Sequence, residues 1–532
     1  MKKLLFFVIF QVTAVFVYAQ GYKNPVIPGF YPDPSICRVG SDYYLVNSSF
    51  EYFPGVPVWH SKDMVHWQQI GNILNRESQL PLKNCKPSNG IYAPTIRYNK
   101  GTFYMVVTLV NGDKHYGNFY VTAQNPAGPW SDPIGVDQNG IDPSLFFDDD
   151  GKVYFISNRG HNSNDPRAIY QSQIDVKTGK RLTEIKELWK GSGGSYVEAP
   201  HMYKKDGFYY LQTAEGGTSY GHSVAISRSK SIWGPYQSCP NNPILTNRMA
   251  YSNIQGTGHA DMVQATDGSW WLVHLGFRPA VDGVHFIGRE TCLTPVEWPE
   301  GQWPVVNGNG QTDEVIKKTP PDFDVNGPLP NNLYANNFDN GTLGFDWIYL
   351  RNPDSTNYSL FKHPGFLSLK GSAFNLFDLE SPTFVGRRQS HFNLKLSTNL
   401  IFNPQNENEE AGLTLLMTNV FHYDVFVKKL GGQRVVVVRY ALDSLKQVLT
   451  QMPLEDGPVE LKVIGNKQLY HIYYQQNGKL TQLAILNTRF LGTEVTGGYN
   501  GVIMGLYATG NGKKATSTAD FDWFKYEPIA PF

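Results

Sequence analysis

Apolar and polar positions alternate along most of the chain, and turns that contain glycine interrupt the alternation. In the first half, one pattern occurs five times: an acidic or small residue, usually before Pro, then a short apolar run, a Gly-containing turn and an aromatic-rich run. The copies begin at Asp33, Ala93, Asp142, Ala199 and His259. Alternation with period two around such a turn is typical of a β-hairpin. We therefore expect five hairpins, about 50 to 60 residues apart.

The spacing of these hairpins predicts a five-bladed β-propeller with one blade per copy and long loops. Three downstream segments are interpreted as outer strands of the blades: VWHSKDMVHW from Val58, YVTAQNPAGPW from Tyr120 and AISRSKSIWGPY from Ala225. The first strand of each copy would then be innermost. The residues that start the copies would converge on the propeller axis.

A change of composition follows the predicted propeller, which is assigned to 20–303. Residues 304–333 are rich in Pro, Asn and Gly, which is typical of a linker or a packed irregular connection. Beyond them, short alternating segments predict a β-sandwich of concanavalin or jelly-roll type at 334–532. The predicted fold class is all-β. Two domains agree with the chain length of 532 residues, because one compact core holds roughly 250 to 300.

The first residues read MKKLLFFVIFQVTAVFVYAQ, with two lysines, an apolar run from Leu4 to about Val17, and the small residue Ala19. This order is typical of a secretory signal peptide, assigned to 1–19. An uncleaved membrane anchor is disfavoured, because the apolar run is shorter than the ~20 residues that span a bilayer. We expect a periplasmic or secreted protein without a membrane anchor.

Charge and cysteine content narrow the functional classes. The chain has 46 Lys+Arg and 46 Asp+Glu, so it lacks the basic excess that nucleic acid or acidic membranes would require of a partner. The four cysteines are scattered without CxxC spacing, which argues against a zinc or redox site. They are interpreted as buried small side chains, and one bridge is left open because export permits disulfides.

Three carboxylates stand at the predicted axial positions: Asp33, Asp142 and Glu198. Either Asp alone could cap a turn as an Asp-Pro pair. Two Asp-Pro pairs and one Glu-Ala-Pro in register with a five-fold repeat are hard to explain by packing, because buried carboxylates are costly unless paired or used. Glycoside hydrolysis needs one carboxyl that protonates the leaving oxygen and one that activates water or attacks carbon. A third can tune the pKa of the acid.

Eight sequence motifs carry a resemblance to a known family. In chain order they are GFYPDPSI, SSFEYFPGVPVWHSKDMVHW, IYAPTIRY, GIDPSLFFDDDG, YVEAPHMY, AEGGTSY, GTGHADMV and GRET. Together they resemble glycoside hydrolase family 43, in the two-domain branch of β-xylosidases and α-L-arabinofuranosidases. The resemblance covers essentially the whole mature chain. It implies a five-bladed propeller, a β-sandwich that helps to close the pocket, and inversion of the anomeric carbon.

The resemblance implies a role for each residue that matches a family motif. Asp33 would be the general base, Glu198 the general acid, and Asp142 the residue that tunes the pKa of the acid. The implied substrate-binding residues are Phe50, Tyr92, Thr218, His259 and Arg289.

Three of these residues have alternative interpretations. Tyr92 departs from the family pattern, in which Trp stands, and this leaves the sugar open. Arg289 could form a surface ion pair, and His259 could be a core histidine or a ligand of a central metal ion. A lone His does not predict a metal ligand. We therefore expect no required cofactor, and leave open a structural Ca²⁺ or Na⁺ ion near the propeller axis.

The predicted function is an exo-acting, inverting glycosidase that releases terminal α-L-arabinofuranose from hemicellulose side chains, such as those of xyloglucan or arabinoxylan. A β-xylosidase acting on xylo-oligosaccharides is the alternative, because both sugars present similarly placed hydroxyls. A retaining fructosidase is rejected: its family pattern has Arg before the second Asp-Pro and Cys after the catalytic Glu, where this chain has Ile141 and Ala199. A non-catalytic sugar-binding propeller would be expected to lack one carboxylate, and all three are present.

Overall fold

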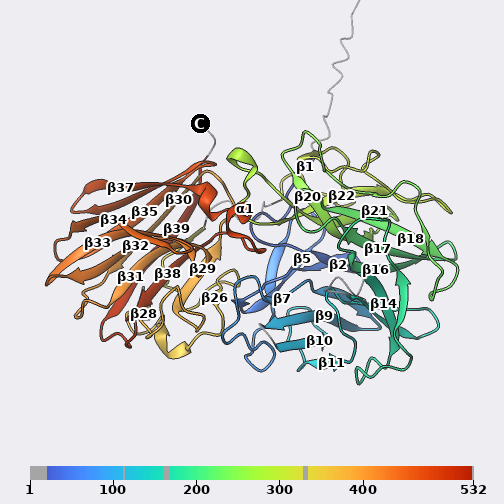
Figure 1. Cartoon of the computed structure of the whole chain (residues 1–532), viewed down its shortest axis with the longest axis horizontal. Coiled ribbons are helices and arrows are strands. Elements are labelled where there is room, and N and C mark those ends of the chain that lie inside the picture. Colours follow the sequence, from blue (N-terminus) through green and yellow to red (C-terminus); the bar gives the residue numbers. More distant parts are fainter. Residues whose placement is uncertain (1–20, 112–113, 160–166, 328–333, 530–532) are drawn as a thin grey trace, which may run out of the picture.

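The computed structural model describes residues 21–111, 114–159, 167–327 and 334–529. Two β domains lie side by side, a propeller in blue to green and a sandwich in yellow to red (Figure 1). The predicted all-β fold, a five-bladed propeller followed by a β-sandwich, is confirmed. The predicted signal peptide, 1–19, lies outside the described residues.

The propeller consists of five antiparallel sheets whose strands follow chain order. Blade 1 contains β2 (Ser35–Val39), β3 (Asp42–Val46), β5 (Gly55–Ser61) and β6 (Gln68–Leu74). Blade 2 contains β7 (Gly90–Ile91), β8 (Thr95–Asn99), β9 (Thr102–Asn111), β10 (Lys114–Ala123) and β11 (Ile134–Val136). Blade 3 contains β12 (Ser144–Phe147), β13 (Val153–Arg159), β14 (Ala168–Ile174) and β15 (Lys186–Trp189).

The last two blades have the same arrangement. Blade 4 contains β16 (Glu198–Lys205), β17 (Phe208–Glu215), β18 (Ser223–Ser229) and β19 (Gln237–Ser238). Blade 5 contains β20 (Gln255–Gln264), β21 (Trp270–Phe277), β22 (Glu290–Glu297) and β23 (Val305–Val306). In every blade the predicted hairpin forms a consecutive antiparallel pair that includes the innermost strand, and the innermost strands β2, β8, β12, β16 and β20 contact one another.

Apolar side chains fill the space between neighbouring blades. Val58 of blade 1 packs with Met105 and Phe119 of blade 2, and all three are buried. Successive side chains of a strand point to opposite faces, and β21 is buried along nearly its whole length, so its side chains face both neighbouring blades. Runs of apolar residues within the hairpins therefore form the interfaces between blades.

Part of the predicted linker, 304–333, belongs to the propeller. Val305–Val306 is the outermost strand of blade 5. β24 (Val315–Ile316) pairs with β1 (Tyr22–Lys23) near the start of the described chain. Two-residue strands have no measurable period, so the sequence pattern could not reveal them.

The sandwich contains two sheets. The first has the strand order β27 (Tyr358–Ser359), β28 (Leu367–Lys370), β39 (Thr518–Pro528), β30 (Leu394–Ile401), β35 (Val459–Gly465), β36 (Leu469–Gln476) and β37 (Lys479–Asn487), with β25 (Tyr334–Asn336) beside β39. The second has the order β29 (Thr383–Arg388), β38 (Ile503–Thr509), β31 (Glu410–Thr418), β32 (Phe421–Leu430), β33 (Gln433–Leu442) and β34 (Leu445–Pro453). Leu396, Leu413 and Leu461 are among the side chains buried in its core.

Helical structure is limited to short turns in the described residues. They are η1 (Val281–Gly283), η2 (Ser355–Asn357), η3 (Thr488–Leu491) and α1 (Thr493–Thr496). No helix within the described ranges is long and apolar enough to cross a membrane.

The two domains share a strand pair and an apolar cluster. β4 (Tyr52–Phe53) of the propeller pairs antiparallel with β26 (Tyr349–Leu350) of the sandwich region. Beside this pair, Phe30 and Phe50 belong to the same buried cluster as Phe384 of the sandwich. The domains are therefore joined by backbone hydrogen bonds as well as by apolar packing.

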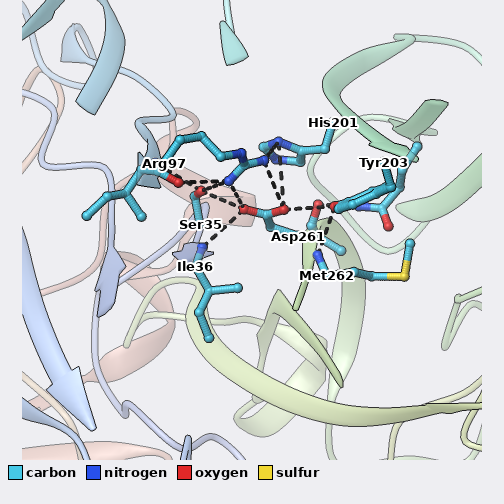
Figure 2. Close-up of polar contacts among 10 residues, drawn as sticks. Ser35, Ile36, Arg97, His201, Tyr203, Asp261 and Met262 are labelled. Atoms are coloured by element: carbon cyan, nitrogen blue, oxygen red, sulfur yellow. Dashed lines mark hydrogen bonds and ion pairs between the residues drawn. The ribbon is translucent and has the colours of Figure 1, made fainter. Parts of the chain in front are cut away.

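A buried polar network joins the innermost strands of four blades (Figure 2). The carboxylate of Asp261 on β20 accepts hydrogen bonds from Ser35 on β2 at 2.6 Å, Arg97 on β8 at 2.7 Å and Tyr203 on β16 at 2.8 Å. His201 Nδ1 lies 2.9 Å from the Arg97 guanidinium. Burial alone would raise the pKa of Asp261, but Arg97 more than offsets this and holds it well below its usual value.

We expect Asp261→Asn to destabilise the propeller. The change removes one charge of a buried pair and leaves Arg97 uncompensated, which typically costs about 3–5 kcal/mol. Urea unfolding of the full chain should show a lower midpoint. The matched control is Asp149→Asn, whose side chain is 85% exposed and pairs with Lys204 at the surface, so its effect should stay within about 1 kcal/mol. Equal midpoints for the two variants would contradict this prediction.

Candidate active site

A cavity of about 400 Å³ lies where the first residues of the blades converge. All eight residues predicted from the sequence line it, and three more residues join them. The lining residues are Asp33, Phe50, Tyr92, Ala93, Ile141, Asp142, Glu198, Thr218, His259, Arg289 and Tyr499. We refer to this site as the central cavity.

The backbone at the start of the blades has an unusual conformation. Asp33, Asp142, Ala199 and His259, which begin four of the five repeats, have φ between 45° and 54°. Residues other than glycine rarely adopt this left-handed region, and they persist there only when the surrounding structure imposes it. Because these residues share one backbone conformation, the chain follows the same local path at this point in each of these four blades. Glu198 precedes Ala199 and also reaches the central cavity.

Asp33 is held as a carboxylate. Arg289 Nη1 lies 2.7 Å from its Oδ1, the Ser48 hydroxyl donates to its Oδ2 at 2.6 Å, and His259 Nδ1 lies 3.6 Å away. Burial alone would raise the pKa of Asp33, but these neighbours more than offset it and lower the pKa below its usual value. Asp33 is therefore ionised at neutral pH. Burial also lowers the pKa of His259, which favours its neutral form.

Asp142 and Glu198 form a pair with the opposite electrostatics. Burial, then the charges of Glu198 and Asp33, raise the pKa of Asp142 well above its usual value, although the Ala199 amide donates to it at 3.1 Å. Burial raises the pKa of Glu198 to about 7; Arg167 opposes the shift and Asp33 adds to it. The pair therefore retains a proton near neutral pH.

Three aromatic rings form one wall of the central cavity. The ring centroids of Phe50 and Tyr92 are 5.5 Å apart, and that of Tyr499 lies 6.0 Å from Phe50 and 6.2 Å from Tyr92. The Arg289 guanidinium lies over the rings of Phe50 and Tyr499, and it donates to the Thr218 hydroxyl at 3.0 Å. Flat apolar rings beside a planar cation suit a sugar, which has both C–H faces and hydroxyl groups.

Tyr499 comes from the sandwich and was missed by the sequence analysis. Its backbone N–H donates to the Ser88 hydroxyl of the propeller at 2.9 Å. The next residue, Asn500, donates to the buried carboxyl of Glu51 at 2.6 Å. Burial raises the pKa of Glu51 to about 7. Tyr499 lies in a Gly-rich loop, GGYNG, which has no periodic pattern to mark it.

The structure shows neither a metal cluster nor a disulfide in its described part. No group of three or more His, Cys, Asp or Glu side chains there is placed to hold a metal ion. The ion considered near the axis stays a prediction. The four cysteines, Cys37, Cys85, Cys239 and Cys292, are all buried and unpaired.

The central cavity thus combines an ionised carboxylate, a carboxyl pair that keeps a proton, and an aromatic wall. This combination fits acid–base hydrolysis of a glycosidic bond, in which one carboxyl activates water and another protonates the leaving oxygen. The structure brings all eight predicted residues together. The individual catalytic roles stay predictions.

Comparisons with known proteins agree across both domains. The family model described as glycosyl hydrolases family 43 matches residues 22–304, and a beta xylosidase C-terminal concanavalin A-like domain matches 335–527. The chain is 44% identical over 510 residues to the non-reducing end alpha-L-arabinofuranosidase BoGH43B of Bacteroides ovatus, covering 95% of this chain and 94% of that protein. It is 39% identical to a xylosidase/arabinosidase of Butyrivibrio fibrisolvens, covering 95% and 99%.

Solved structures show the same relationship. The Bacteroides ovatus protein named xyloglucan PUL GH43B superposes with a TM-score of 0.91 at 44% identity, covering 96% of this chain and all of that one. The BlXynB protein of Bacillus licheniformis gives a TM-score of 0.88 at 35% identity, with the same two coverages. Because the similarity covers both the propeller and the sandwich, the chain belongs to glycosyl hydrolase family 43.

Proposed function

We propose that the protein is an exo-acting, inverting α-L-arabinofuranosidase that removes terminal non-reducing arabinofuranose from hemicellulose side chains. The observation that carries the sugar assignment is the 44% identity, over 95% of the chain, to a protein named as a non-reducing end alpha-L-arabinofuranosidase. The small central cavity supports exo action, because it suits one terminal sugar and the sandwich supplies part of its wall. The name of the similar solved structure makes xyloglucan one candidate polysaccharide.

The proposed reaction uses protein groups alone and needs no cofactor. Asp33 takes a proton from a water molecule whose oxygen attacks the anomeric carbon. As the bond from that carbon to the leaving oxygen breaks, Glu198 donates its proton to this oxygen. Burial keeps the pKa of Glu198 high, and we assign Asp142 the role of tuning it, since two neighbouring carboxyls resist ionising together. Arg289 holds Asp33 and is placed to bind sugar hydroxyls.

A β-xylosidase is the second candidate. The name of the Butyrivibrio fibrisolvens relative, xylosidase/arabinosidase, includes both activities. A similar chain is therefore described as acting on either sugar. Tyr92 lies in the wall that would contact the sugar, and its hydroxyl adds a polar group there. We also propose export to the periplasm or the medium, supported by the order of charged, apolar and small residues in 1–19.

The first experiment is product analysis on arabinoxylan, xyloglucan, arabinan and xylo-oligosaccharides. We expect arabinose to be the sugar released. Proton NMR of the first product, read before mutarotation, should show the anomeric configuration opposite to that of the substrate. Release of xylose alone would favour the second candidate, and a retained configuration would contradict the role of Asp33 as a base.

The proposed acid and base predict different substrate dependences. Glu198→Gln should reduce kcat/KM by about 10²–10⁴-fold on substrates with poor leaving groups, and far less on activated aryl glycosides, which need little protonation. Asp33→Asn should strongly reduce kcat/KM on both kinds of substrate, because the attacking water needs a base in either case. Glu184→Gln is the matched control: it lies at an exposed position of the propeller and should change neither. A similar loss for Glu198→Gln on both substrate types would argue against its role as acid.

The pKa shifts predict a bell-shaped pH profile of kcat/KM. Activity should fall at low pH as Asp33 becomes protonated, and the lowered pKa of Asp33 places this limb below the usual range of an Asp side chain. It should fall at high pH as the acid loses its proton, with a midpoint at about 7. With an activated aryl glycoside, the alkaline limb should disappear in Glu198→Gln. An unchanged alkaline limb in this variant would assign it to another group.

A further inference from the structure

The residues of the central cavity account for one bound sugar, so the rest of the substrate must lie outside it. If Glu198 is the acid, as proposed above, it protonates the oxygen that joins the bound sugar to the next ring. That ring then begins within hydrogen-bond distance of the Glu198 carboxyl group. The side chain of Glu198 is 15% exposed and so reaches the opening of the central cavity.

Two side chains stand beside Glu198 but do not line the central cavity: Arg167 and Tyr196. Arg167 Nη1 lies 3.8 Å from Glu198 Oε2, and the Arg167 guanidinium carbon lies 4.1 Å from the centre of the Tyr196 ring. The arginine side chain is 28% exposed and the tyrosine 49%. Both side chains are therefore accessible to solvent beside Glu198.

Hydrogen bonds to Glu215 hold the loop that carries Tyr196. The buried carboxylate of Glu215 accepts hydrogen bonds from the Ser192 amide at 2.6 Å and the Gly194 amide at 2.8 Å. Tyr196 has a φ of 58°, which a bulky residue adopts only when its surroundings impose it. Its ring packs on Gly217, where an added Cβ would lie 3.3 Å from the ring. The backbone that carries the ring is thus held in place without a substrate, and the ring has a packing partner in Gly217.

The chemistry of this pair suits a sugar. A guanidinium is planar and presents five N–H donors in a rigid fork, which matches two adjacent hydroxyl groups. Stacking on Tyr196 and the contact with Glu198 restrict the Arg167 side chain, so little conformational freedom is lost on binding. We propose that Arg167, positioned by Tyr196, binds the leaving-group sugar, a pyranose ring with two adjacent free hydroxyls, and so forms the subsite next to the central cavity.

Arg167 also acts on the acid through its charge, and the test must separate the two effects. Arg167 opposes the raised pKa of Glu198, so its removal alters protonation of the acid for every substrate that needs it. Binding of the leaving-group sugar matters only for a substrate that has one. Methyl α-L-arabinofuranoside needs the acid but has no second sugar. α-L-Arabinofuranosyl-(1→2)-xylose needs the acid and has the sugar, whose O3 and O4 hydroxyls are adjacent and free.

We therefore compare kcat/KM on these two substrates for the wild type, Arg167→Ala and Arg167→Lys. On arabinofuranosyl-(1→2)-xylose, the kcat/KM of Arg167→Ala should fall about tenfold or more, mainly through KM, and on the methyl glycoside it should change by less than roughly threefold. Arg167→Lys keeps the charge but not the fork, so it should restore the alkaline pH limb without restoring KM. The control, Arg38→Ala, removes an exposed arginine near the other end of β2 and should leave both substrates unchanged.

The outcomes distinguish this inference from the proposed function. Equal losses on the two substrates, or no loss on either, would overturn the subsite. Full restoration of KM by Arg167→Lys would show that Arg167 acts only through its charge. This result would also overturn the proposed subsite. A wild-type protein that cleaves neither substrate would contradict the proposed arabinofuranosidase activity itself. Tyr196→Leu should reproduce the KM increase with a smaller shift of the alkaline limb, because the charge of Arg167 remains.

Discussion

Three carboxyl groups share one small cavity, and the free energy of placing like charges together away from water limits how each of them can exist. Arg289 and the Ser48 hydroxyl stabilise Asp33 as a carboxylate. With that charge fixed, Asp142 and Glu198 cannot both ionise at low cost, and their pair keeps a proton. An ionised carboxylate in the same cavity as a carboxyl group that keeps its proton is the combination that acid–base hydrolysis of a glycosidic bond requires. The electrostatics that make the buried cluster tolerable therefore also prepare it for reaction.

Much of this site could be predicted because the propeller repeats itself. Asp33 and Asp142 occupy the same place in two copies of one hairpin, and Glu198 stands one residue before that place in another. Because the blades are arranged around one axis, residues at the same position of each repeat come close together. This can be inferred without knowing any side-chain contact. The β-sandwich was predictable for a simpler reason: its strands are long enough for alternation to be visible, as in Leu394–Ile401 and Leu469–Gln476.

What the sequence could not reveal depends on contacts between distant parts of the chain. The Asp261–Arg97 pair joins two blades, and neither residue stands out from its strand. Tyr499 enters the site through a loop that Ser88 and Glu51 hold from the other domain. Val305–Val306 and Val315–Ile316 add to the propeller from a segment whose composition is that of a linker. In each case tertiary pairing, and not a local pattern, decides the structure.

The contribution of Tyr499 has a consequence for how such a protein can change. Its ring completes the aromatic wall, yet it belongs to the sandwich, and β26 beside the sandwich pairs with β4 of the propeller. The border between the domains thus passes through the site, and neither domain is an independent module. Shuffling the sandwich for an unrelated partner would open the cavity. A single exchange at position 499, by contrast, offers a route to new sugar preferences without any alteration to the blades that carry the acids.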